Sequence, residues 1–86
     1  MIFHYRITHR AIKDLEKFDD SIKVRLRKAL LRFQSAPLKH AEKLTDSQLG
    51  SYRFRVGDYR IIFDLVESDI VVLRIGHRRD IYKRRS

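Results

Sequence analysis

The stretch that decides the fold runs from residue 52 to residue 63 and reads Tyr52-Arg53-Phe54-Arg55-Val56-Gly57-Asp58-Tyr59-Arg60-Ile61-Ile62-Phe63. Every second residue on either side of Gly57-Asp58 is apolar or aromatic, which is the pattern of two β-strands joined by a two-residue turn. Such a turn sets the register and places Val56 opposite Tyr59. We therefore predict a β-hairpin with one apolar face.

The second face of this hairpin is cationic. The same register places Arg55 opposite Arg60, with Arg53 two residues further along. Like charges paired across strands destabilise a sheet, and an anion between them relieves the repulsion. A guanidinium group meets two phosphate oxygens with its fixed fork of donors and stays charged at any working pH. We therefore expect this face to bind a phosphodiester.

A third strand is predicted from Ile70 onward, after a turn at Glu67-Ser68-Asp69. We expect Val71, Leu73 and Ile75 on the core side of this strand, so that up to five guanidinium groups gather on the opposite face. Arginine at exposed strand positions often serves solubility alone. Clustering favours a binding surface, because the last thirteen residues hold six cations, namely Arg74, Arg78, Arg79, Lys83, Arg84 and Arg85.

The residues before the hairpin predict a strand and two helices. Residues 3 to 7 alternate as a half-buried strand does. Thr8 and Asp19-Asp20-Ser21 are typical N-caps, and Ser35-Ala36-Pro37 ends the second helix. Residues 38–50 have weak periodicity and are read as a connection with one short helical turn. The apolar stripes predicted to face the core are Ala11, Ile12, Leu15 and Phe18 in the first helix, and Ile22, Leu26, Ala29, Leu30 and Phe33 in the second.

Length and composition agree with this pattern. The chain has 86 residues, of which 43% are hydrophobic, and no Pro/Gly/Ser-rich linker divides it. We predict one α+β domain spanning residues 1–86, with a strand, a helical hairpin and an antiparallel meander in the order β-α-α-β-β-β.

Net charge and cysteine content indicate the class of binding partner and the cellular compartment. A formal net charge of +9 favours a polyanionic partner, either a nucleic acid or an acidic protein. There is no cysteine, so disulfides and thiolate metal sites are excluded and a reducing cytoplasm is expected. No signal-peptide pattern or long apolar stretch predicts export or membrane insertion.

Two blocks carry a resemblance to a known family. The hairpin stretch quoted above and the later block Val72-Leu73-Arg74-Ile75-Gly76-His77-Arg78-Arg79-Asp80-Ile81-Tyr82 resemble the RelE toxin family in residue types and in spacing. The resemblance implies a toxin of a type II toxin-antitoxin system that cuts messenger RNA in the ribosomal A site without a cofactor. It also implies a RelB-like antitoxin that covers the basic surface in a toxin-antitoxin hetero-oligomer.

The resemblance also assigns roles to residues of this chain. Arg60 and Arg78 fall where arginines hold the scissile phosphate, Tyr82 falls on the catalytic tyrosine, and His77 falls where relatives place a basic or titratable residue. The RNA-binding residues expected around them are Arg53, Arg55, Arg74, Arg79 and Lys83.

The general base is left open by this assignment. Cleavage needs a base for the ribose 2′-hydroxyl, cations for the charged phosphorane and an acid for the leaving 5′-oxygen. Arginine is a reluctant base, whereas histidine titrates near neutral pH. A tyrosine titrates well above neutral pH unless positive charge surrounds it. We therefore take His77 and Tyr82 jointly as candidates for proton transfer. No metal is expected, because His4, His9 and His40 lack metal-ligand spacing.

Three alternatives stay open at this point. A ParE-like toxin has the same fold but poisons DNA gyrase, and the combination of Arg60, Arg78 and Tyr82 argues against it. A non-catalytic RNA-binding or ribosome-binding module would use the basic sheet for docking alone. A degenerate, inactive toxin would keep the pattern without turnover.

Overall fold

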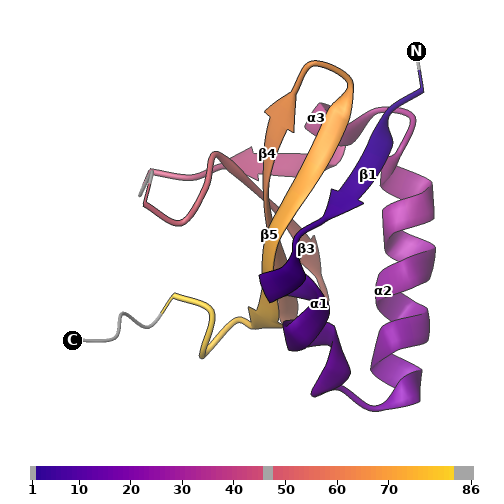
Figure 1. The fold of residues 1–86 in the computed structure, drawn as a ribbon, viewed down its shortest axis with the longest axis vertical. Coiled ribbons are helices and arrows are strands. Elements are labelled where there is room, and N and C mark those ends of the chain that lie inside the picture. The colour runs from indigo at the N-terminus through magenta and orange to yellow at the C-terminus, as the bar shows by residue number, and fades with distance from the viewer. Residues whose placement is uncertain (1, 46–47, 83–86) are drawn as a thin grey trace.

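The computed structural model describes residues 2–45 and 48–82, which form one sheet with two long helices on one of its faces (Figure 1). In chain order the elements are β1 (His4–Ile7), α1 (His9–Glu16), α2 (Asp20–Phe33), α3 (Pro37–His40), β2 (Ala41–Lys43), β3 (Tyr52–Val56), β4 (Tyr59–Val66) and β5 (Asp69–His77). The predicted α+β class and the predicted order of strand, helical hairpin and meander are confirmed.

The five strands lie in the order β1-β5-β4-β3-β2. β1 runs parallel to β5, and the other neighbouring strands are antiparallel. The predicted hairpin register is confirmed, since Val56 pairs with Tyr59 and Arg55 pairs with Arg60. Gly57 has a φ of 59°, in the left-handed region where a residue without a Cβ is least strained. The turn chemistry of the sequence thus sets the alignment of the basic strands.

Both predicted helix caps are present. The Thr8 hydroxyl accepts a hydrogen bond from the Ala11 N–H. The Asp19 carboxylate accepts one from the Ile22 N–H and one from the Ser21 hydroxyl, which hold the pKa of Asp19 below its usual range. Each cap satisfies an N–H that has no partner within its helix. The caps therefore define where the two helices of the hairpin begin.

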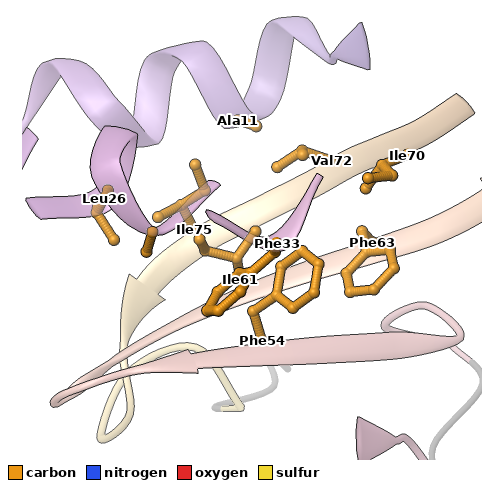
Figure 2. Packing of buried hydrophobic residues seen from close by; sticks show 10 residues of the cluster. Ala11, Leu26, Phe33, Phe54, Ile61, Phe63, Ile70, Val72 and Ile75 are labelled. Carbon is orange, nitrogen blue, oxygen red and sulfur yellow. The ribbon is translucent and has the colours of Figure 1, made fainter. Parts of the chain in front are cut away.

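The core lies between the helices and the sheet, as Figure 2 shows. The ring centroid of Phe54 is 4.5 Å from that of Phe33 in α2 and 4.3 Å from that of Phe63 in β4. The predicted stripe of α2 faces this core, whereas Ile12 of the α1 stripe is 44% exposed, contrary to expectation. The aromatic stack ties α2 to the strands that carry the arginines.

The predicted facing of the third strand is wrong at two positions. Residues of β5 that face the core are Ile70, Val72 and Ile75, so Val71 and Leu73 do not belong to it. Phe63 pairs with Val72 while Ile62 pairs with Arg74, which leaves Leu73 as an extra residue. Such a β-bulge reverses the alternation of side chains beyond it. The predicted facing is therefore reversed before the bulge, whereas Arg74 keeps its predicted alternation with the core residue Ile75.

A fifth strand, β2, is missing from the prediction. The segment read as a connection contains the short helix α3 and then three residues that pair with β3. Three residues are too few for a period of two to stand out in the sequence. This short strand matters because it places Glu42 directly beside Arg53.

Candidate nucleic-acid interface

Arg53 is the centre of the cationic face. Its Nη1 donates a hydrogen bond to the Tyr82 hydroxyl at 2.8 Å, and its Nε donates one to Oε1 of Glu42 at 2.9 Å. The guanidinium carbon also lies 5.7 Å from the centroid of the Tyr82 ring. Its hydrogen bonds to Tyr82 and Glu42 raise the pKa of Arg53. One arginine thus links β2, β3 and the segment that follows β5.

Glu42 is a site residue that the sequence reasoning did not select. It accepts the hydrogen bond from Arg53, and its second oxygen lies 3.6 Å from Nη1 of Arg55. The hydrogen bond from Arg53 is the main cause that lowers the pKa of Glu42, and the charges of neighbouring arginines add to it. Only the pairing of β2 with β3 could have indicated it, and that pairing has no clear sequence signal. A carboxylate therefore lies within the cationic face.

Arg55 and Arg78 are the exposed arginines at the two sides of the β3–β4 turn. The Arg55 side chain is 57% exposed and that of Arg78 is 53% exposed. The Arg78 N–H donates to the carbonyl oxygen of Asp58 at 2.7 Å, and its Nε lies 3.7 Å from that residue's carboxylate. A long ion pair between exposed groups is weak. Both guanidinium groups are therefore accessible to an incoming phosphate.

Arg60 is paired as predicted but is not exposed. Only 5% of its surface is accessible, and its Nη1 donates to the carbonyl oxygens of Gly57 and Tyr59, each at 2.9 Å. Its cross-strand neighbour Gly76 is covered by Ile81, since a Cβ there would lie 3.0 Å from the Ile81 Cδ1. Its side chain therefore folds back onto the turn, and the phosphate contact expected for Arg60 stays a prediction.

The structure also separates His77 from Tyr82. His77 pairs with Tyr59, which packs edge-on against Phe18 on the helix-covered face. The imidazole lines a cavity of about 420 Å³ together with residues of α1, and its Nδ1 accepts the Arg79 N–H at 3.1 Å. Tyr82 lies on the opposite face, with Arg53. The two residues expected to act jointly are therefore not adjacent.

The guanidinium group of Arg74 pairs with α1 and is not free for the cationic face. Its Nε lies 2.8 Å from the Asp14 carboxylate of α1, which also accepts the Ile75 N–H at 2.9 Å. Asp14 is 7% exposed, so this ion pair joins α1 to the bulge of β5. Arg74 pairs with Ile62, which in turn pairs with Arg53, so its strand position is the expected one and only its guanidinium is drawn to α1. Arg79 is exposed, and Lys83 lies outside the described residues.

Two further observations concern residues 2–45 and 48–82. Within these ranges, no group of three or more histidine and acidic side chains is arranged to hold a metal ion. No helix in the same ranges is long and apolar enough to cross a membrane. The expected independence from metal stays a prediction.

Comparison with known proteins identifies the family. The sequence model of the ParE toxin of type II toxin-antitoxin systems matches residues 5–82. This chain belongs to the RelE/ParE toxin superfamily. Toxin RelG of Mycobacterium tuberculosis is 31% identical over 91 residues, covering 98% of this chain and 100% of that protein. The RelE/ParE protein described here is thus a toxin of a type II toxin-antitoxin system.

Solved structures of RelE toxins have the same fold. The RelBE2 toxin-antitoxin complex of Mycobacterium tuberculosis matches with a TM-score of 0.82 and 25% identity, over 91% of this chain and 100% of that chain. A mutant of Escherichia coli toxin RelE in the free state matches with a TM-score of 0.74 and 20% identity, over 95% and 92%. The fold of this RelE/ParE protein therefore matches that of solved RelE toxins over nearly the whole chain.

Proposed function

We propose that this toxin is a ribosome-dependent endoribonuclease that cleaves translated messenger RNA in the ribosomal A site. The observation that carries the proposal is the contact of Arg53 with both Tyr82 and Glu42 beside the exposed Arg55. This arrangement combines cations for a phosphate with two groups that exchange protons. Phosphodiester cleavage by a 2′-hydroxyl requires that combination.

Tyr82 is proposed as the acid that protonates the leaving 5′-oxygen. Arg53 donates to the phenol oxygen, so the phenol proton is directed elsewhere and is available to a substrate. The same guanidinium stabilises the phenolate left after proton transfer. A tyrosine that only packs its ring on a sheet would not need this donor.

Glu42 is proposed as the base that accepts the 2′-hydroxyl proton. Like any glutamate it is ionised at neutral pH, and its lowered pKa makes it a weaker base than a free carboxylate. His77 stays the second candidate for proton transfer and would act from the other side of β5. The variants Glu42→Gln and His77→Gln distinguish the two candidates. The substitution at the residue that acts as the base should lower kcat far more than the substitution at the other residue.

The phosphate is proposed to bind between Arg55 and Arg78, with Arg79 as a further exposed cation. An incoming phosphate would displace Glu42 from Arg55 readily, because that pair is long and exposed. Arg60 contributes indirectly, because its hydrogen bonds to the Gly57 and Tyr59 carbonyl oxygens stabilise the turn between β3 and β4. Arg74 forms an ion pair with Asp14 and therefore has a structural role in this proposal.

A cognate antitoxin of the RelB type is the proposed protein partner. The relatives RelBE2 of Mycobacterium tuberculosis and RelB-RelE of Methanococcus jannaschii are toxin-antitoxin complexes. The net charge of +9 favours an acidic antitoxin segment over the cationic face. Leu15, Leu26, Leu30 and Leu31 line an apolar groove of about 280 Å³ between the helices and β1, which suits an apolar side chain of such a partner.

Purified components test the enzymatic proposal. Toxin is mixed with 70S ribosomes that hold a defined message, and the RNA is resolved on a denaturing gel. We expect one cut within the A-site codon and no cut when ribosomes are omitted. Intact message in both reactions would reject the proposal.

Inhibition of DNA gyrase is the second candidate function, because the matching family description names ParE. A supercoiling assay with purified gyrase separates the two. Gyrase inhibition without cleavage of ribosome-bound message would assign this chain to the ParE activity.

A further inference from the structure

A second cationic groove lies next to the β3–β4 turn, between α2 and β3. Its volume is about 350 Å³. Its lining consists of four cations and three small or apolar residues, namely Arg25, Lys28, Arg32, Arg55, Ala29, Val56 and Gly57. Arg55 belongs both to this groove and to the cationic face described above. The groove is therefore continuous with the proposed RNA site.

Helical spacing brings three of these cations together. Arg25, Lys28 and Arg32 are separated by three and four residues, so they lie on one side of α2. All three are exposed, while Ala29 between them is 2% exposed and forms the floor.

The glycine of the turn shapes one wall of the groove. The Arg25 guanidinium lies so close to Gly57 that a Cβ on this residue would be 2.6 Å from the Arg25 Nη2. The left-handed φ of Gly57 is therefore one requirement for glycine, and space for Arg25 is a second. This packing holds the guanidinium at the mouth of the groove.

Arg25, Lys28 and Arg32 form no ion pair with an acidic residue in the part of the chain that the structure describes. Among the described residues, no carboxylate lies within 4.0 Å of the charged nitrogens of Arg25, Lys28 or Arg32. Like charges three or four residues apart on a helix repel each other. An anion bound between them would remove the repulsion and gain several charge-assisted hydrogen bonds.

We propose that this groove is a second phosphodiester-binding site, which continues the RNA track from Arg55 onto α2. The inference rests on the proposed function, since the same RNA-bound complex would occupy both sites. Message and ribosomal RNA share the backbone chemistry, and either can supply the phosphate. An acidic protein segment fits less well, because stable protein interfaces need buried apolar anchors and the groove offers only Ala29 and Val56 at its lining.

The test compares two double variants of the same helix. The groove variant combines Arg25→Gln with Arg32→Gln and removes two positive charges from the groove. Lys23→Gln with Arg27→Gln is the matched control, because it removes the same charge from residues that line the apolar groove instead. Glutamine has a helix propensity close to those of lysine and arginine. Both variants should therefore unfold within a few degrees of wild type, which circular dichroism checks.

Binding to free RNA is measured with a 2′-O-methyl single-stranded RNA, which has no hydroxyl for cleavage, at several salt concentrations. Each lost phosphate contact lowers the slope of log K against log salt by about 0.7 on a single strand. If message occupies the groove, the groove variant should lose about 1.4 in slope relative to wild type. The control variant should lose less than half of that amount.

Binding to 70S ribosomes carrying the same 2′-O-methyl message identifies the source. Weaker binding of the groove variant to free RNA and to ribosomes supports message, and weaker binding to ribosomes alone supports ribosomal RNA. The proposal is overturned if the groove variant matches the control in both assays. It is also overturned if only the affinity for poly-glutamate, used as an acidic polypeptide, falls. These assays measure binding and do not depend on cleavage. A toxin that binds RNA through the groove but does not cut it would therefore contradict the nuclease proposal and leave the groove proposal standing.

Discussion

At the scale of single residues, the site depends on arginines that do different work in spite of their similar sequence context. Arg53 holds a phenol and a carboxylate, Arg55 and Arg78 are open to solvent, and Arg60 is buried against the turn. Alternation in the sequence predicts which face a strand residue lies on. It does not predict whether a long side chain extends from that face or folds back onto the backbone.

Tyr82→Phe should lower cleavage of ribosome-bound message by about 10²-fold or more, because it removes the proposed acid. The ring and its contact with the Arg53 guanidinium remain, so the fold should be unchanged. Single-turnover cleavage rates measure the effect. A phenylalanine variant with the wild-type rate would exclude Tyr82 from proton transfer.

Arg78→Ala should abolish growth arrest on induced expression while the protein stays folded. The side chain is exposed, and its ion pair with Asp58, at 3.7 Å, is weak, so its loss costs little stability. Growth curves with parallel thermal unfolding of the purified variant provide the measurement. Full toxicity of the alanine variant would remove Arg78 from the phosphate site.

At the scale of elements, the bulge in β5 determines which residues of this strand face the core. The apolar pattern of residues 70–75 predicted the strand and its pairing with β4, but the extra residue Leu73 reverses the facing predicted for Val71 and Leu73. Next to the bulge, the Asp14 carboxylate of α1 accepts hydrogen bonds from the Ile75 N–H and from the Arg74 Nε. The sequence pattern alone could not reveal that long-range contact.

Asp14→Asn should destabilise the fold by about 2 to 3 kcal/mol, because a buried carboxylate loses charge-assisted bonds to Arg74 and to the Ile75 backbone. Glu16→Gln is the matched control, since this acid of the same helix is exposed. Urea unfolding of both variants provides the comparison. Equal midpoints for the two would show that the Asp14 ion pair contributes no net stability.

Tyr5 should make stability depend on pH in the alkaline range. Its hydroxyl donates to the Leu30 carbonyl oxygen, and burial raises the pKa of Tyr5 to about 12. The protonated form is favoured in the folded state, so this stabilisation is complete below about pH 10 and is lost as pH rises toward 12. Tyr5→Phe should flatten that part of the unfolding profile. An unchanged profile would contradict the linkage.

At the scale of the whole molecule, the hairpin register, the caps and the core stripe of α2 follow from turn chemistry and periodicity. The site is less predictable, because it is assembled from three separate segments. Arg53 and Tyr82 were expected, whereas Glu42 arrives on a strand too short to recognise. His77 shares a motif with Tyr82 but lies across the sheet from it.

Charge distribution links this architecture to its partners. Helix α2 carries apolar residues toward the sheet and cations on its open side, so the helix that completes the core also extends the basic surface. A high net charge of one sign raises association rates with polyanions. The proposed RNA track therefore continues from the sheet onto α2, whereas the cationic face of the sheet is the part proposed to meet an acidic antitoxin segment.

Primer extension in a bacterial host tests the central claim most directly. The toxin is induced beside two copies of one message, of which one is blocked from initiating translation. The account predicts new 5′ ends within codons of the translated copy alone, and none with the Arg78→Ala variant. Growth arrest with both messages intact would contradict it and would assign the toxicity to another target.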